Sequence, residues 1–77
     1  MTAKQALELM TARRLARSGE ARRIRTAGGL SLSEVASTVG VSPAAVSRWE
    51  SGQRRPYGRP ALAYARLLNS IQEAQGE

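Results

Sequence analysis

Arginine is the residue type in this sequence with the greatest capacity for chemistry. Eleven of the twelve basic residues are arginines, six glutamates are the only acids, and the formal net charge is +6. The arginines fall into two groups: Arg13, Arg14, Arg17, Arg22, Arg23 and Arg25, and then Arg48, Arg54, Arg55, Arg59 and Arg66. A guanidinium makes planar, bidentate contacts with phosphates and guanine edges. High-GC codon usage accounts for part of the arginine bias, but the charge excess indicates a polyanionic partner, either nucleic acid or an anionic membrane.

Several kinds of chemistry are excluded by residues that the sequence lacks. It contains no cysteine, histidine or aspartate. Disulfides and thiolate metal sites are therefore excluded, and general acid–base catalysis lacks most of its usual residues. Glu34 and Glu50 could form a catalytic pair, but a helix-capping role for the first and an ion pair for the second explain them better. We expect neither an enzyme nor a bound metal or cofactor.

The apolar residues are too dispersed for a membrane protein. No apolar run approaches the ~20 residues of a membrane span. Near the N-terminus, Glu8 interrupts the apolar residues where a secretion signal would have its hydrophobic core. An arginine-rich amphipathic helix could lie on an anionic membrane, but its apolar face would be thin. We expect a cytoplasmic protein that associates with the nucleoid.

The helical period recurs along the chain, and no segment alternates with the period of a strand. Thr2 with Gln5, and Ser31 with Glu34, fit capping boxes that start helices. The expected helices cover about residues 3–17, 19–27, 32–39, 43–51 and 60–72. The pattern does not decide whether Gly19 breaks the chain, because a glycine costs a helix interior only about 1 kcal/mol. We predict an all-α fold of five helices.

One apolar stripe per helix is expected to face a common core. The stripes comprise Ala3, Leu7, Met10, Thr11 and Leu15; Ala21, Ile24 and Ala27; Leu32, Val35, Ala36 and Val39; Ala45, Val46 and Trp49; and Ala61, Tyr64, Leu67, Leu68 and Ile71. Trp49 follows Val46 by three residues, which favours the core over stacking on a base. Tyr57 is also expected to pack, although its hydroxyl could reach a phosphate.

The helices expected at 32–39 and 43–51 are joined by Gly40 and a short turn. The second helix starts with Ser42 as N-cap and Pro43 in its first turn, where the missing N–H does no harm. Its outer face carries Ala44 and Ser47, and side chains this small would let the backbone approach a groove closely. The pattern is typical of a helix-turn-helix, in which the second helix enters the major groove of DNA.

The segment LSLSEVASTVGVSPAAVSRWESGQRRP resembles the Cro and phage-repressor (xenobiotic-response-element) family of helix-turn-helix proteins. The matching features are Ala36, Gly40, Val46, Glu50-Ser51-Gly52, Ile24-Arg25, Gly29-Leu30 and Arg55-Pro56. The resemblance covers about residues 20–71 and implies a lambda-repressor-like DNA-binding domain. We therefore expect an N-terminal helical extension at 1–18, the helix-turn-helix domain at 19–72 and a frayed tail at 73–77.

The resemblance implies roles for individual residues. Base contacts fall to Ala44, Ser47 and Arg48, and phosphate contacts to Ser31, Ser33, Ser42, Ser51, Gln53, Arg54 and Arg55. Arg48 is the candidate for a bidentate contact with guanine, worth about 1–3 kcal/mol of discrimination. Pro43 and Leu32 replace amide side chains frequent in the family, so two of its contacts are expected to be absent. Arg25 and Glu50 are implied to form a largely buried ion pair that orients the recognition helix.

These observations together predict sequence-specific binding of double-stranded DNA by a small transcriptional regulator, first of all a repressor of the phage or plasmid kind. A homodimer on a pseudopalindromic operator is expected, with the last helix as the first candidate for its interface and the N-terminal helix as the second. Residues 1–18 could equally cover the core, form a dimerisation arm or contact DNA.

Two other functions use the same fold. One is an antitoxin-like or adaptor module that binds a protein, which an exposed apolar patch on the first or last helix would support. The other is an architectural DNA binder without sequence preference, whose affinity would fall steeply with salt.

Overall fold

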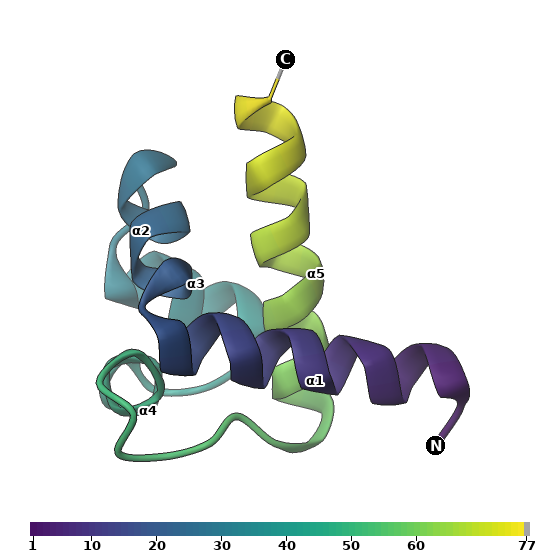
Figure 1. The fold of residues 1–77 in the computed structure, drawn as a ribbon. Helices are drawn as coiled ribbons and strands as arrows, with labels where there is room; N and C mark the ends of the chain where they lie inside the picture. Colours follow the sequence, from purple (N-terminus) through teal and green to yellow (C-terminus); the bar gives the residue numbers. More distant parts are fainter. Residues whose placement is uncertain (77) are drawn as a thin grey trace.

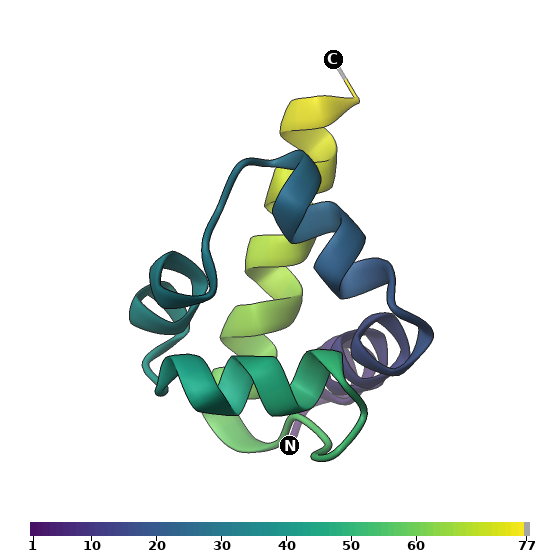
Figure 2. The same ribbon diagram turned by 90° about the vertical axis from the view of Figure 1, so that its left-hand side faces the viewer.

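The computed structural model describes residues 1–76, which form five helices and no strand. The helices are α1 (Ala3–Ser18), α2 (Glu20–Ala27), α3 (Leu32–Val39), α4 (Pro43–Glu50) and α5 (Gly58–Gln75). The all-α expectation is confirmed. In Figure 1, α5 stands upright, α1 crosses its lower half, and α2, α3 and α4 lie to the left. Figure 2 shows α4 crossing in front of α5. Within the described residues, no helix has both the length and the apolar character needed to cross a membrane.

The starts of α1 and α3 follow the caps in the sequence. The hydroxyls of Thr2 and Ser31 accept from the backbone N–H groups of Gln5 and Glu34, at 3.1 and 3.0 Å. In return, the side chains of Gln5 and Glu34 accept from the backbone N–H groups of their caps, which completes both capping boxes. Gly19 separates α1 from α2 in a left-handed conformation, with φ +85°. Other residue types adopt this conformation at a cost of about 1–2 kcal/mol, so the glycine ends the helix here.

Both ends of α5 differ from the sequence expectation. The helix begins at Gly58 rather than at Pro60, because a proline is tolerated where backbone N–H groups have no partner within the helix. It continues to Gln75, whose Nε2 donates to the carbonyl of Ala27 at 3.1 Å and ties the last turn to the end of α2. The tail expected to fray, 73–77, is therefore helical as far as Gln75, and Glu77 lies outside the described residues.

A single core joins all five helices. Its buried members are Ala12, Leu15 and Ala16; Ala21 and Ile24; Val35, Ala36 and Val39; Val46 and Trp49; and Ala61, Tyr64, Ala65 and Leu68. Trp49 is only 4% exposed, and its ring centroid lies 4.9 Å from that of Tyr64 at an interplanar angle of 48°. The expectation that Trp49 belongs to the core is confirmed.

The buried face of α1 is not the one that the sequence pattern predicted. Leu7 and Met10 are 61% and 64% exposed, so the prediction that they face the core was wrong. The helix is rotated so that Ala12, Leu15 and Ala16 point inward instead. Glu8 lies on this inner side and its carboxylate accepts from Nε of Arg66 on α5 at 2.8 Å. Small alanines and this ion pair decide the rotation of α1, where a count of large apolar residues suggested another.

Candidate nucleic-acid interface

Helices α3 and α4 are joined by a turn of three residues with a fixed geometry. Gly40 ends α3 in the left-handed conformation, with φ +84°, and its N–H donates to the carbonyl of Ala36 at 2.8 Å. The N–H of Val41 donates to the same carbonyl at 3.0 Å. The hydroxyl of Ser42 then accepts from the N–H of Ala45 at 3.1 Å and starts α4. Because backbone and cap hydrogen bonds hold the turn, the relation between α3 and α4 is set locally.

Helix α4 has one buried side and one exposed side. Val46 and Trp49, 0% and 4% exposed, anchor it to the core. The exposed side carries the three residues to which the sequence analysis assigned base contacts, Ala44, Ser47 and Arg48. In Figure 2, α4 lies at the front of the molecule with no other helix before it. The helix is therefore rigidly mounted, and only Arg48 extends far from its outer face.

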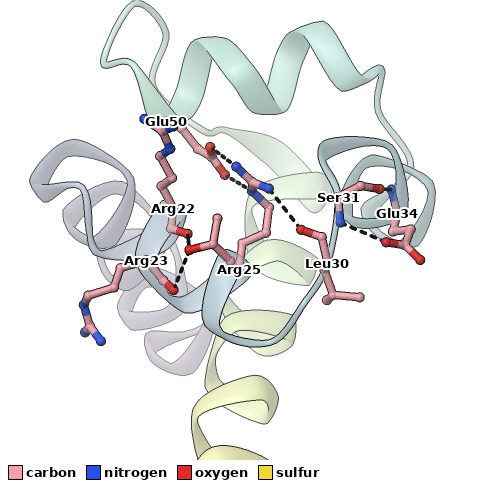
Figure 3. Close-up of polar contacts among 8 residues, drawn as sticks. Arg22, Arg23, Arg25, Leu30, Ser31, Glu34 and Glu50 are labelled. Carbon is pink, nitrogen blue, oxygen red and sulfur yellow. Dashed lines mark hydrogen bonds and ion pairs between the residues drawn. The ribbon is translucent and has the colours of Figure 1, made fainter.

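Arg25 and Glu50 are in direct contact, as the resemblance implied. Nε and Nη2 of Arg25 donate to the two carboxylate oxygens of Glu50 at 2.6 and 2.9 Å (Figure 3). The exposed fractions of the two side chains are only 11% and 7%. A third bond runs from Nη1 of Arg25 to the carbonyl of Leu30 at 3.0 Å. The hydrogen bonds with Glu50 raise the pKa of Arg25, so the guanidinium stays charged and ties α2 to the end of α4.

Tyr64 lies beneath this pair in the core. Burial, and to a lesser degree the charge of Glu50, raise the pKa of its phenol above the ordinary value. Within the described residues its hydroxyl is buried without a hydrogen-bond partner. The tyrosine is thus a packing residue, as expected, whereas Tyr57 is 66% exposed and the prediction that it packs was wrong.

The serines at the start of α3 have different environments. Both the hydroxyl and the N–H of Ser31 are engaged by Glu34 in the capping box. The N–H of Ser31 lowers the pKa of Glu34, so a carboxylate already caps this helix end. Ser33 is exposed, and its side chain makes no hydrogen bond with the residues that the structure covers. Ser33 is therefore better placed than Ser31 to meet an external phosphate.

The basic loop after α4 is tied back to that helix. The N–H groups of Gln53 and Arg54 both donate to the carbonyl of Arg48, at 2.9 and 3.2 Å. Further along, Pro56 is buried. Arg54 and Arg55 are exposed between these two fixed points. Their side chains therefore project from a loop that is already ordered.

Arg22 is a basic residue beside α4 whose role the sequence left undecided. It lines a hollow of about 260 Å³ with Ser47, Glu50 and Ser51 of the recognition helix and its cap. Figure 3 shows the side chain of Arg22 extending towards Glu50, whereas that of Arg23 points away. The signal was present in the sequence, because Arg22 precedes Arg25 by three residues and so shares its helical face.

Ion pairing leaves the positive charge concentrated around α4. Three pairs, Arg14–Glu20, Arg25–Glu50 and Arg66–Glu8, use three of the glutamates at N–O distances of 3.7, 2.6 and 2.8 Å. No such pair within residues 1–76 involves Arg22, Arg48, Arg54 or Arg55. These four arginines surround the outer face of α4, so the surface next to that helix favours a polyanion.

A family comparison agrees with this geometry. The model of the helix-turn-helix family, of the Cro and phage-repressor type, matches residues 22–73, more than half of the chain. The chain belongs to this family. Searches of curated proteins and of solved structures returned no significant match. The fold is accordingly a small helix-turn-helix domain of the lambda-repressor type, and its family role is DNA binding in the regulation of transcription.

Helix α1 lies outside the part of this helix-turn-helix protein that the family model matches. Its residues Ala12, Leu15 and Ala16 nevertheless belong to the same core as the matched helices. The extension is therefore packed into the DNA-binding domain and forms one body with it.

Proposed function

We propose that this helix-turn-helix protein binds double-stranded DNA sequence-specifically and regulates transcription, first of all as a repressor, with α4 in the major groove. The observation that carries the proposal is the exposed face of α4. Ala44, Ser47 and Arg48 project from a helix that Val46 and Trp49 hold against the core. A narrow, rigid helix with one long donor side chain suits the groove.

The proposed contacts divide into base and phosphate contacts. Arg48 donates to the O6 and N7 atoms of a guanine, Ala44 touches a thymine methyl group, and Ser47 reads a neighbouring base. The phosphate contacts are assigned to Ser31, Ser33, Ser42, Ser51, Gln53, Arg54 and Arg55, to which the placement of Arg22 adds one more. Phosphate contacts position the protein, and base contacts specify the site.

A homodimer on a pseudopalindromic operator is part of the proposal, because one recognition helix reaches only a few base pairs. The apolar stripe of α5, the first candidate for the interface, is used within its own chain: Ala61, Tyr64 and Leu68 are all 0% exposed. Leu7 and Met10 of α1 are exposed instead. This apolar pair favours α1 as the dimer interface. It is also the observation that favours a protein-binding role, of the antitoxin or adaptor kind, as the second candidate function.

The test is fluorescence-anisotropy titration with a duplex from the DNA flanking the gene and with a scrambled duplex, at two salt concentrations. We expect the flanking duplex to bind at least about a hundredfold more tightly. Arg48→Ala should remove that preference, whereas Arg59→Ala, which deletes an equal charge from the start of α5, should weaken both duplexes alike. Sedimentation velocity of the complexes gives the number of chains bound.

The alternatives make different predictions in the same experiment. Equal binding of both duplexes with a steep salt dependence would replace the regulator by an architectural DNA binder. No binding to either duplex would shift the assignment to the protein-binding role.

A further inference from the structure

A second group of arginines gathers beside α4, and half of it comes from the helix outside the family match. Arg13 and Arg17 are four residues apart on α1 and therefore share a face. They line a hollow of about 190 Å³ together with Arg54 and Arg55 of the loop that follows α4. None of the residues lining this hollow is acidic. Four guanidinium groups thus converge from segments about forty residues apart in sequence.

The walls of this hollow are held in place. Nε of Arg13 donates to the carbonyl of Pro56 at 2.9 Å, which joins α1 to the loop. At the other end of the loop, the N–H of Arg54 donates to the carbonyl of Arg48 at 3.2 Å. Arg54 and Arg55 therefore lie between two anchored points. Trp49, buried in the core, closes the hollow on the side of α4.

The negative charges of α1 and its neighbours are used elsewhere. Glu8 pairs with Arg66 at 2.8 Å, and Glu20 pairs with Arg14 at 3.7 Å. Arg13 and Arg17 form no ion pair within the described part of the chain. Bringing four like charges together is unfavourable unless an anion enters, so the hollow has the chemistry of a site for a phosphate group.

We propose that Arg13 and Arg17, with Arg54 and Arg55, bind a backbone phosphate of the DNA next to the groove that α4 enters. This inference rests on the proposed function. The hollow includes Gly52, two residues beyond the end of α4, so a duplex that touches Arg48 and Ser51 already passes close to it. The C-terminal half of α1 lies on the same side of the molecule as α4 (Figure 1). The covering helix of the core therefore also lengthens the DNA footprint.

Arg14 provides a matched control for Arg17. Both are exposed arginines on α1, but Arg14 pairs with Glu20 and does not line the hollow. Arg17 makes no hydrogen bond that holds the loop, whereas Arg13 does. Arg17→Gln and Arg14→Gln are therefore the informative pair, and equal thermal midpoints by circular dichroism will show that both variants fold.

The experiment measures the affinity of the full chain for the flanking and scrambled duplexes as salt is varied. We expect Arg17→Gln to weaken binding to both duplexes about fivefold, which corresponds to ~1 kcal/mol. The slope of log K against log salt should fall by about 0.9 for the lost phosphate. The ratio between the two duplexes should not change, and Arg14→Gln should keep the wild-type slope.

Equal effects of the two substitutions on affinity and slope would overturn the phosphate site while leaving the proposed function intact. Failure of the proposed function has a different signature, since the wild type itself would then not distinguish the duplexes. If Arg17→Gln left the DNA slope unchanged, the arginines would not contact the DNA backbone, and an acidic protein segment would become the anion to examine.

Discussion

Both carboxylate oxygens of Glu50 accept from the guanidinium of Arg25, at 2.6 and 2.9 Å, although the two residues lie on different helices. The contact links α2 to the last residue of α4, and a further bond to Leu30 adds the loop before α3. Removing two charges from water offsets much of their attraction. The main consequence of the pair is therefore the orientation of the recognition helix, with little net gain in stability.

Substitution of one partner should be much more harmful than substitution of both. Glu50→Gln leaves a buried guanidinium without its counter-charge, and we expect the free energy of unfolding to fall by about 3–5 kcal/mol. The double variant Arg25→Met with Glu50→Leu should recover part of that loss. Urea unfolding followed by far-UV circular dichroism measures all three proteins. Glu8→Gln, which breaks the more exposed pair with Arg66, is the control. A loss for Glu50→Gln no larger than for Glu8→Gln would contradict the buried-pair interpretation.

Trp49 should report on the core and not on the DNA. It is the only tryptophan in the sequence, so its fluorescence can be followed directly. We expect acrylamide to quench it weakly, with or without DNA, because the side chain is 4% exposed. Trp49→Ala should lower stability by about 3–5 kcal/mol, whereas Trp49→Phe should fold and keep the preference for the flanking duplex. If Trp49→Phe instead lost DNA affinity at unchanged stability, a stacking contact of about 1–3 kcal/mol with a base would be indicated.

Acid should destabilise the protein through two glutamates. Hydrogen bonds lower the pKa of Glu34, through Ser31, and of Glu8, through Arg66, below the ordinary value of 4.5. Each contribution is therefore complete above that value and is lost as pH falls through the lower pKa of the folded state. The urea midpoint should be flat near neutral pH and decrease below about pH 4.5. Glu34→Gln keeps an oxygen acceptor for the cap and should flatten part of this decrease. An acid dependence identical to that of the wild type would show that Glu34 does not contribute.

The sequence by itself determined the helix boundaries of the motif. The capping box of Ser31 with Glu34, the left-handed Gly40 and the N-cap Ser42 each act within a few residues of their own position. Such interactions depend on local backbone geometry, which residue types at fixed spacing specify. Trp49 was placed in the core by the same reasoning, since its spacing from Val46 is helical. The resemblance to a known family then implied the contact between Arg25 and Glu50.

Only the tertiary structure decided how α1 is rotated and which arginines it presents to the rest of the molecule. Glu8 meets Arg66, and Arg13 meets the carbonyl of Pro56, across sequence separations of 58 and 43 residues. Spacing along one helix cannot reveal which of its faces another segment will cover. The exposure of Leu7 and Met10 depends on that choice, because burying Ala12 and Ala16 turns them to the solvent.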